Sequence, residues 1–125
     1  AEIARVLRPG GLFFFDTINR TLRSRIAVIG AMQNWRATAF VPPDTHAYRN
    51  FIKPRELKWM LETNRLIPGE MRGLSPHCHP LSALLDLHRR ARGAISFEEL
   101  GRRLAFGPSG DLSISYIGYA KKKAP

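Results

Sequence analysis

The chain has 125 residues, 44% of them hydrophobic, which is typical of one globular domain and argues against a disordered segment. Twenty Lys and Arg against ten acidic residues give a net charge of +10, and fifteen of the twenty are Arg, so partners that carry phosphate or carboxylate are favoured. The single cysteine excludes an internal disulfide and favours a reducing compartment, and no apolar run approaches the ~20 residues of a membrane span.

The chain opens with the pattern of a helix, a turn and a strand. Residues 2–7 have apolar side chains at helical spacing, Pro9 ends that helix, and residues 12–15 form a continuous apolar run. Such a run is typical of a strand covered on both faces of a parallel sheet, so we expect an α/β fold. Because the chain starts at Ala1 within this helix, we expect an N-terminal part to be missing and the strand to expose an apolar edge.

The rest of the chain contains alternating helical and extended patterns. The spacing of apolar residues predicts helices over residues 21–33, 54–64, 80–92 and from residue 96 onward, and strands over residues 70–74 and 112–120. In the first of these helices, the apolar side chains near one face are Leu22, Ile26, Ile29 and Met32. Ser96 has the character of an N-cap.

Polar residues follow the first strand directly. They are Asp16, Thr17, Asn19 and Arg20. In α/β sheets, ligands bind beyond the carboxyl ends of parallel strands, so this cluster is a candidate ligand site. The alternative, equally open from the sequence, is that these residues form a turn and a helix cap.

Two segments carry a family resemblance. "ARVLRPGGLFFFDTINRT", followed by "THAYRNFIKPREL", resembles the C-terminal half of class I S-adenosylmethionine-dependent methyltransferases. The L-R-P-G-G turn is widespread in that class. The Asn-Arg after the strand, then T-H and F-I-K-P-x-E-L, are similar to the ubiquinone-biosynthesis O-methyltransferases, which methylate polyprenyl catechols. The resemblance covers residues 1–75 and, more loosely, residues 107–122.

The resemblance implies a fold and a cofactor. The fold would be the C-terminal part of a Rossmann-like class I methyltransferase sheet, with a helix, a buried strand, helices and two late strands. Residues 1–125 would form a partial domain that lacks the N-terminal cofactor-binding half, and residues 77–106 a helical insertion. S-adenosylmethionine would be bound mainly by the missing half and by no residue of this chain, with a divalent metal such as magnesium as a further expectation. The isolated chain would then be inactive.

The implied reaction moves a methyl group to a phenolic oxygen, which requires a metal or a general base to remove the proton. His46 is the candidate base, and the candidate substrate-binding residues are Asn19, Arg20 and Tyr48. Alternatively, His46 is a loop histidine with a structural hydrogen bond, and Tyr48 packs in the pocket wall.

A polyprenyl substrate resides in a bilayer, so the first long helix is a candidate membrane-contact segment. Its candidate residues are Arg20, Arg23, Arg25, Ile26, Ile29 and Trp35. Counting Arg36 as well, four arginines would contribute at most about 4 kcal/mol at an anionic surface. We therefore expect a cytoplasmic protein, peripheral on the inner membrane face or on the mitochondrial matrix side in a eukaryote. The alternative is a lid helix with solvated arginines.

Three other functions can be compared with the sequence. The "HCHP" run at residues 77–80 lacks the paired spacing of a tetrahedral metal site, so no metal site is predicted there. A basic, non-catalytic module that binds RNA or an anionic membrane remains an alternative, although no RNA-binding aromatic motif is present, which argues against nucleic acid. A class I methyltransferase for another small molecule or for tRNA is the remaining alternative.

Overall fold

The computed structural model describes residues 1–124. Four strands form one sheet, and helices and turns connect them. In chain order the elements are α1 (Glu2–Val6), β1 (Leu12–Ile18), α2 (Leu22–Ser24), the π-helix η1 (Arg25–Asn34), the 3-10 turn η2 (Tyr48–Asn50), α3 (Pro54–Thr63), β2 (Leu66–Pro76), α4 (Pro80–Ala91), α5 (Phe97–Leu104), β3 (Phe106–Ser109) and β4 (Ser115–Lys122).

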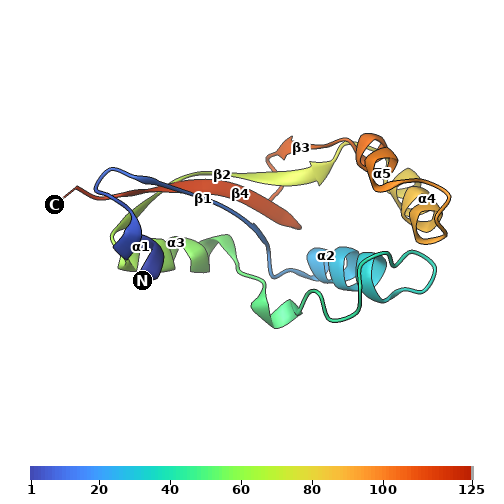
Figure 1. Cartoon of the computed structure of the whole chain (residues 1–125), viewed down its shortest axis with the longest axis horizontal. Coiled ribbons are helices and arrows are strands. Elements are labelled where there is room, and N and C mark those ends of the chain that lie inside the picture. The colour runs from blue at the N-terminus through green and yellow to red at the C-terminus, as the bar shows by residue number, and fades with distance from the viewer. Residues whose placement is uncertain (125) are drawn as a thin grey trace.

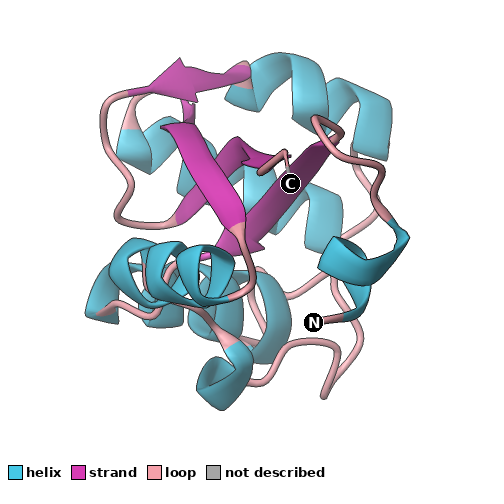
Figure 2. Cartoon of the chain, turned by 90° about the vertical axis from the view of Figure 1, so that its left-hand side faces the viewer, coloured by secondary structure: helices cyan, strands magenta, loops and turns pink. Residues whose placement is uncertain are grey.

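The strand order is β1-β4-β2-β3, and all pairings are antiparallel. Because β1 and β2 both pair antiparallel to β4, these two strands run in the same direction with β4 between them. Both therefore end toward the part of the molecule that holds α2, α4 and α5, whereas the two chain termini lie at the opposite end (Figure 1). Figure 2 looks from that terminal end and shows the strands crossing at an angle, with helices around them.

Helices α1 and α3 cover one face of the sheet. The core on this face contains Leu61 from α3, Leu66 from β2 and Ala120 from β4, with Phe13 and Phe15 packed against them. These residues share one face because side chains alternate along each strand. Helix α3 begins at Pro54, a residue that fits the first turn of a helix because its missing N–H is not needed there.

Within residues 1–124, β1 is covered on one face only, whereas its apolar run predicts cover on both faces; the parallel neighbour expected from the rest of the polypeptide stays a prediction. Phe14 is 70% exposed, since no helix among residues 1–124 packs on its side of β1. The only neighbour of β1 in the described chain is the antiparallel strand β4. The other edge of β1 is unpaired there, as expected. The strand is also longer than expected and ends at Ile18.

The predicted helices agree well with the structure, and the strands less well. Helices α3, α4 and α5 lie where they were expected, and the Ser96 hydroxyl accepts a hydrogen bond from the Glu99 N–H at the start of α5. Strand β2 is longer than predicted and β4 begins later. Strand β3 was not predicted, because its four residues are held in extended form by pairing with β2.

The helix predicted over residues 21–33 is present with a different buried face. It comprises α2 and η1, and its buried side chains include Ser24, Val28 and Ala31, whereas Leu22 and Ile26 are exposed. The rotation is fixed at the start of the helix, where the Ser24 hydroxyl donates to the Asn19 carbonyl. Local polar contacts therefore override the simple apolar stripe.

Candidate functional site

The segment after β1 lies at the carboxyl end of that strand and is anchored on both sides by backbone hydrogen bonds. The Ile52 N–H donates to the Ile18 carbonyl at 3.1 Å, and the Asn19 N–H donates to the Ile114 carbonyl at 2.8 Å. These two bonds place the end of β1 between the loop that follows η2 and the segment that precedes β4. Residues far apart in the sequence therefore meet at this point.

Asn19 is the most deeply buried polar residue of the predicted cluster, with 8% of its surface exposed. Its Nδ2 donates to the Leu112 carbonyl at 2.8 Å. Its Oδ1 is buried and has no hydrogen-bond partner within residues 1–124. An unpaired buried amide oxygen is costly, so this atom is suited to accept a hydrogen bond from a ligand hydroxyl.

Arg20 of this cluster and the neighbouring Thr21 have structural contacts. Arg20 forms an ion pair with Glu56 of α3. The Thr21 hydroxyl accepts from the Ser24 N–H at 3.1 Å, which caps α2. The structural interpretation therefore accounts for Thr21 and for one contact of Arg20, while the Asn19 oxygen is left available.

His46 is held by a residue that the sequence did not single out. The Gln33 side chain of η1 is buried, and its Oε1 accepts from the His46 N–H at 2.8 Å while its Nε2 donates to the His46 carbonyl at 3.3 Å. The His46 Nδ1 is buried without a partner in the described chain. The only sequence signal for Gln33 was a polar residue at the end of a largely apolar helix.

Tyr48 lies in an aromatic and cationic cluster. Its ring packs edge-on against Phe51 with the ring centres 5.6 Å apart, and the Arg25 guanidinium lies 5.4 Å above it. A cation–π contact of an exposed arginine contributes about 0.5–1 kcal/mol. The interpretation of Tyr48 as a wall residue is compatible with these contacts.

Tyr116 of β4 holds the loop of His46 and Tyr48 to the sheet. Its hydroxyl donates to the Ile52 carbonyl at 2.9 Å, and its side chain is fully buried. Burial raises the pKa of Tyr116 to about 12, with a smaller contribution from the negative charge of Glu56. The phenol is therefore a structural donor at neutral pH, and sequence analysis had placed it only in a strand.

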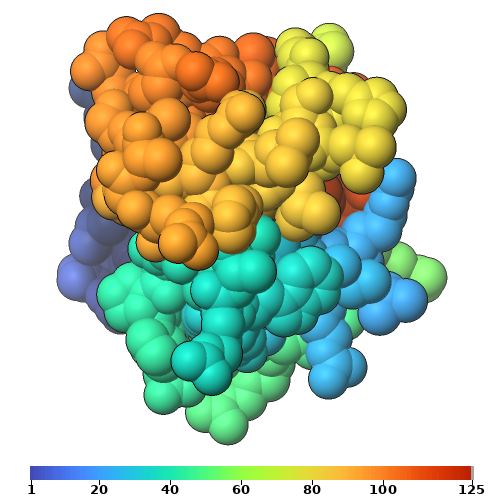
Figure 3. Space-filling model, turned by 90° about the vertical axis from the view of Figure 1, so that its right-hand side faces the viewer, coloured from blue at the N-terminus to red at the C-terminus, as the bar shows by residue number. Residues whose placement is uncertain are grey.

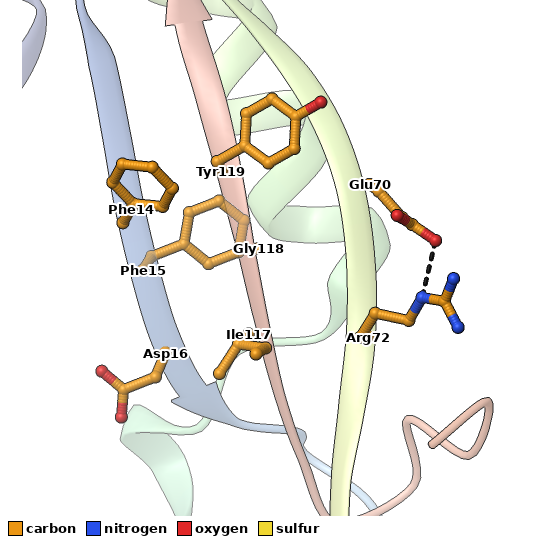
Figure 4. A pocket seen from close by; sticks show the side chains of 8 residues that line it. All are labelled: Phe14, Phe15, Asp16, Glu70, Arg72, Ile117, Gly118 and Tyr119. Atoms are coloured by element: carbon orange, nitrogen blue, oxygen red, sulfur yellow. Dashed lines mark hydrogen bonds and ion pairs between the residues drawn. The ribbon is translucent and has the colours of Figure 1, made fainter. Parts of the chain in front are cut away.

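An open depression of about 480 Å³ lies on the uncovered face of the sheet. Figure 4 shows its residues, with aromatic side chains of β1 and β4 on one side and the Glu70–Arg72 ion pair, at 2.6 Å, on the other. Asp16 is the one residue of the predicted polar cluster that lines it. Asn19, Arg20, His46 and Tyr48 do not, so the structure does not gather all candidate residues there.

The candidate membrane-contact residues divide into two groups. Arg20 and Arg23 pair with Glu56 and Asp111, the second at 2.9 Å. Ile26 and Trp35 are exposed, while Ile29 is half-buried. No helix within residues 1–124 has the length and hydropathy of a membrane span.

The described residues contain no group of three or more His, Cys, Asp or Glu side chains placed to hold a metal ion. In the "HCHP" run, the His79 Nδ1 instead accepts from the Leu81 N–H at 3.2 Å and caps α4. His77 packs against Gly107. These contacts give the two histidines structural roles at the base of the α4–α5 hairpin.

Comparison with known proteins places this chain beside a class of methyltransferases. No family model and no solved structure matches it. Several of the curated proteins that match are named ubiquinone biosynthesis O-methyltransferase, which confirms the resemblance predicted from the sequence. One from Bartonella bacilliformis is 45% identical over 64 residues, or 50% of this chain and 25% of that protein.

Longer matches have somewhat lower identity. The relative from Aliivibrio fischeri strain MJ11 is 39% identical over 67% of this chain, and that from Coxiella burnetii is 36% identical over 69% of it. The chain covers 34% and 35% of these two proteins. It thus spans about a quarter to a third of the length of the relatives cited here.

Proposed function

We propose that this chain is part of an S-adenosylmethionine-dependent O-methyltransferase that acts on a polyprenyl catechol or a related quinone precursor. The observation that carries the proposal is its 36–45% identity to proteins named ubiquinone biosynthesis O-methyltransferase. The activity belongs to a longer polypeptide, because the chain covers only 25% and 35% of the length of these two relatives.

The sheet supports a Rossmann-like arrangement. Strands β1 and β2 run in the same direction with the antiparallel β4 between them, and β1 has an unpaired edge in the described chain. We propose that a parallel strand from the rest of the polypeptide pairs with this edge. That strand would complete a sheet whose ligand side contains Asn19, at the carboxyl end of β1.

The buried, unpaired atoms near this end suggest roles in the reaction. The Asn19 Oδ1 accepts a hydrogen bond from one hydroxyl of the catechol, which orients the ring. His46, whose Nδ1 has no partner in the described chain, would take the proton of the reacting hydroxyl, and S-adenosylmethionine would supply the methyl group to that oxygen when bound. Gln33 holds the His46 backbone during this step. Arg20 and Tyr48 contribute to the substrate wall.

No residue of this chain is assigned to the cofactor or to a metal. S-adenosylmethionine supplies the methyl group, but β1 is followed by Asn19-Arg20-Thr21 and not by a glycine-rich loop, so we assign no residue here to it. The described residues offer no three-ligand metal cluster, and we therefore route no step through a metal.

We also propose that residues 19–36, which contain α2 and η1 and are called the lid below, lie on an anionic membrane, which is where a polyprenyl substrate is found. Leu22, Ile26 and Trp35 are exposed on this lid, and Arg25 and Arg36 beside them have no ion pair in the described chain. Two such arginines would contribute about 2 kcal/mol at an anionic surface. The protein would then be cytoplasmic and peripheral.

The test is turnover with catechols that differ only in tail length. The purified full-length protein should methylate a long-tailed catechol, and the His46→Gln variant should lose at least about 100-fold in kcat with little change in KM. Asn19→Ala should mainly raise KM. Unchanged kcat in the His46 variant would reject the base assignment, and no turnover with any catechol would reject the function.

A further inference from the structure

The helical hairpin α4–α5 has an apolar surface that the proposed reaction does not use. Leu81, Leu84 and Leu85 lie on one face of α4, at spacings of three and four residues, and all three are exposed. Helix α4 is amphipathic, since Asp86 on its other side is buried and paired with arginine. Three clustered, exposed leucines on one helix face call for an explanation.

This face is continuous with the lid. A depression of about 310 Å³ is lined by Leu84, Leu85 and His88 of α4 together with Trp35, Ala37 and Thr38. A second depression of about 260 Å³ is lined by Ile26, Ile29 and again Trp35. The two meet at the Trp35 indole, so an apolar band runs from η1 across Trp35 onto α4.

The hairpin is fixed by direct contacts to the segment that follows η1 and the lid. The His88 Nδ1 donates to the Ala37 carbonyl at 2.6 Å, and the Phe97 ring of α5 packs edge-on against Phe40 with 5.7 Å between centres. Figure 3 views this end of the molecule, where the yellow and orange hairpin lies directly above the teal segment that follows η1. The two apolar surfaces are therefore held together.

Charge favours an anionic partner for this band. Residues 77–106 contain five arginines and three carboxylates, and all three carboxylates form ion pairs with arginines of the same hairpin. The lid segment, residues 19–36, contains four arginines and no acidic residue; Arg20 and Arg23 pair with carboxylates outside the segment, and Arg25 and Arg36 have no ion pair in the described chain. An apolar band with unbalanced arginines beside it is complementary to an anionic bilayer, where leucine and tryptophan insert below the headgroups.

We infer that α4 provides a second bilayer contact, in which Leu81, Leu84 and Leu85 insert beside Trp35 into an anionic membrane. The inference rests on the proposed membrane position of the lid and extends it to the hairpin. The band lies at the end of the molecule toward which β1 and β2 run, so insertion places the candidate site next to the bilayer (Figure 1). A substrate with a long apolar tail can then reach that site without crossing water.

The experiment compares vesicle binding by two matched double variants of the purified full-length protein. Leu81→Gln/Leu85→Gln removes side chains that are 66% and 57% exposed, and Val6→Gln/Ile67→Gln removes side chains that are 67% and 48% exposed. Vesicles of phosphatidylcholine with phosphatidylglycerol are sedimented with each protein. The α4 variant should bind about tenfold more weakly, and the control variant within twofold of the parent.

A direct readout uses fluorescence. In a Trp59→Phe background, Trp35 is the only tryptophan among the 125 residues, and brominated lipids should quench its fluorescence on binding. In a background that lacks both tryptophans, Leu85→Trp should be quenched and Ile67→Trp should not.

Each other outcome has a distinct meaning. If the α4 variant binds like the parent while Ile26→Gln/Trp35→Gln loses binding, the α4 contact is wrong and the lid proposal stands. If the parent does not bind anionic vesicles but methylates a short-tailed catechol, both membrane proposals fail and the catalytic proposal stands. If the α4 variant changes only the oligomeric state, the α4 face is a protein interface and the inference is overturned.

Discussion

The hydroxyl of Tyr116 should contribute measurably to stability through one hydrogen bond. It is fully buried and donates to the Ile52 carbonyl at 2.9 Å. Tyr116→Phe keeps the ring and its edge-on contact with Phe15, with 6.5 Å between ring centres, but leaves the carbonyl without its donor. Losing a typical hydrogen bond costs about 1 kcal/mol, and an unsatisfied acceptor raises the loss to about 1–2 kcal/mol.

The assay is urea unfolding followed by circular dichroism, with the free energy of unfolding and the slope m fitted for each protein. Tyr116→Phe should lower the midpoint at unchanged m. Tyr119→Phe is the matched control, because Tyr119 lies on the uncovered face of the same strand and its hydroxyl has no partner in the described chain. It should change stability by less than about 0.5 kcal/mol. Equal stability of the two variants would refute the stabilising role of the hydrogen bond from Tyr116 to Ile52.

Three further predictions concern stability. Burial raises the pKa of Tyr116 from 10.0 to about 12, so its contribution to the free energy of unfolding is complete below pH 10 and declines as pH rises through 12. Chemical unfolding measured across this pH range should show this loss of stability, and Tyr116→Phe should reduce the loss. Asp86→Asn should cost about 1–2 kcal/mol by chemical unfolding, because it weakens buried contacts with the partly exposed Arg89 and Arg103; no loss would contradict this ion-pair role. Gly73→Ala should cost at least about 2 kcal/mol, because the new Cβ would overlap the Asp111 backbone. Gly101→Ala, in open space on α5, should stabilise the protein by about 0.5–1 kcal/mol. Melting temperatures of the two variants that move in the same direction would contradict this.

The elements that sequence predicted well have local signals at their ends. Pro54 opens α3, and Ser96 caps α5 through the Glu99 N–H, so each start is marked within a few residues. The family motif likewise predicted the relatives found by comparison. Short-range chemistry and a recognisable motif are both readable from a single sequence.

The features that sequence missed depend on distant residues. The run of residues 12–15 was expected to be covered on both faces, but the exposure of Phe14 depends on which helices pack on β1. The pairing of β3 with β2 joins segments about thirty residues apart in sequence and has no local signature. The secondary-structure propensities of the residues alone do not predict these contacts.

The candidate site shows the same division. The polar cluster after β1 was visible in sequence, but the bond from Asn19 to Leu112 spans 93 positions and could not be inferred. Gln33 became a functional candidate only once both of its bonds to the His46 backbone were known. Sequence thus located the strand but placed its end three residues too early, and the fold identified which atoms near the true end at Ile18 remain unpaired.

The most direct test of the proposed function follows the methyl group. The purified full-length protein is incubated with S-adenosylmethionine labelled in its methyl group, a polyprenyl catechol in anionic vesicles, and RNA as a competing acceptor. The account predicts that the label appears on a phenolic oxygen of the catechol, located by fragmentation of the product in a mass spectrometer. Label on RNA, on a ring carbon or on no acceptor at all would contradict it.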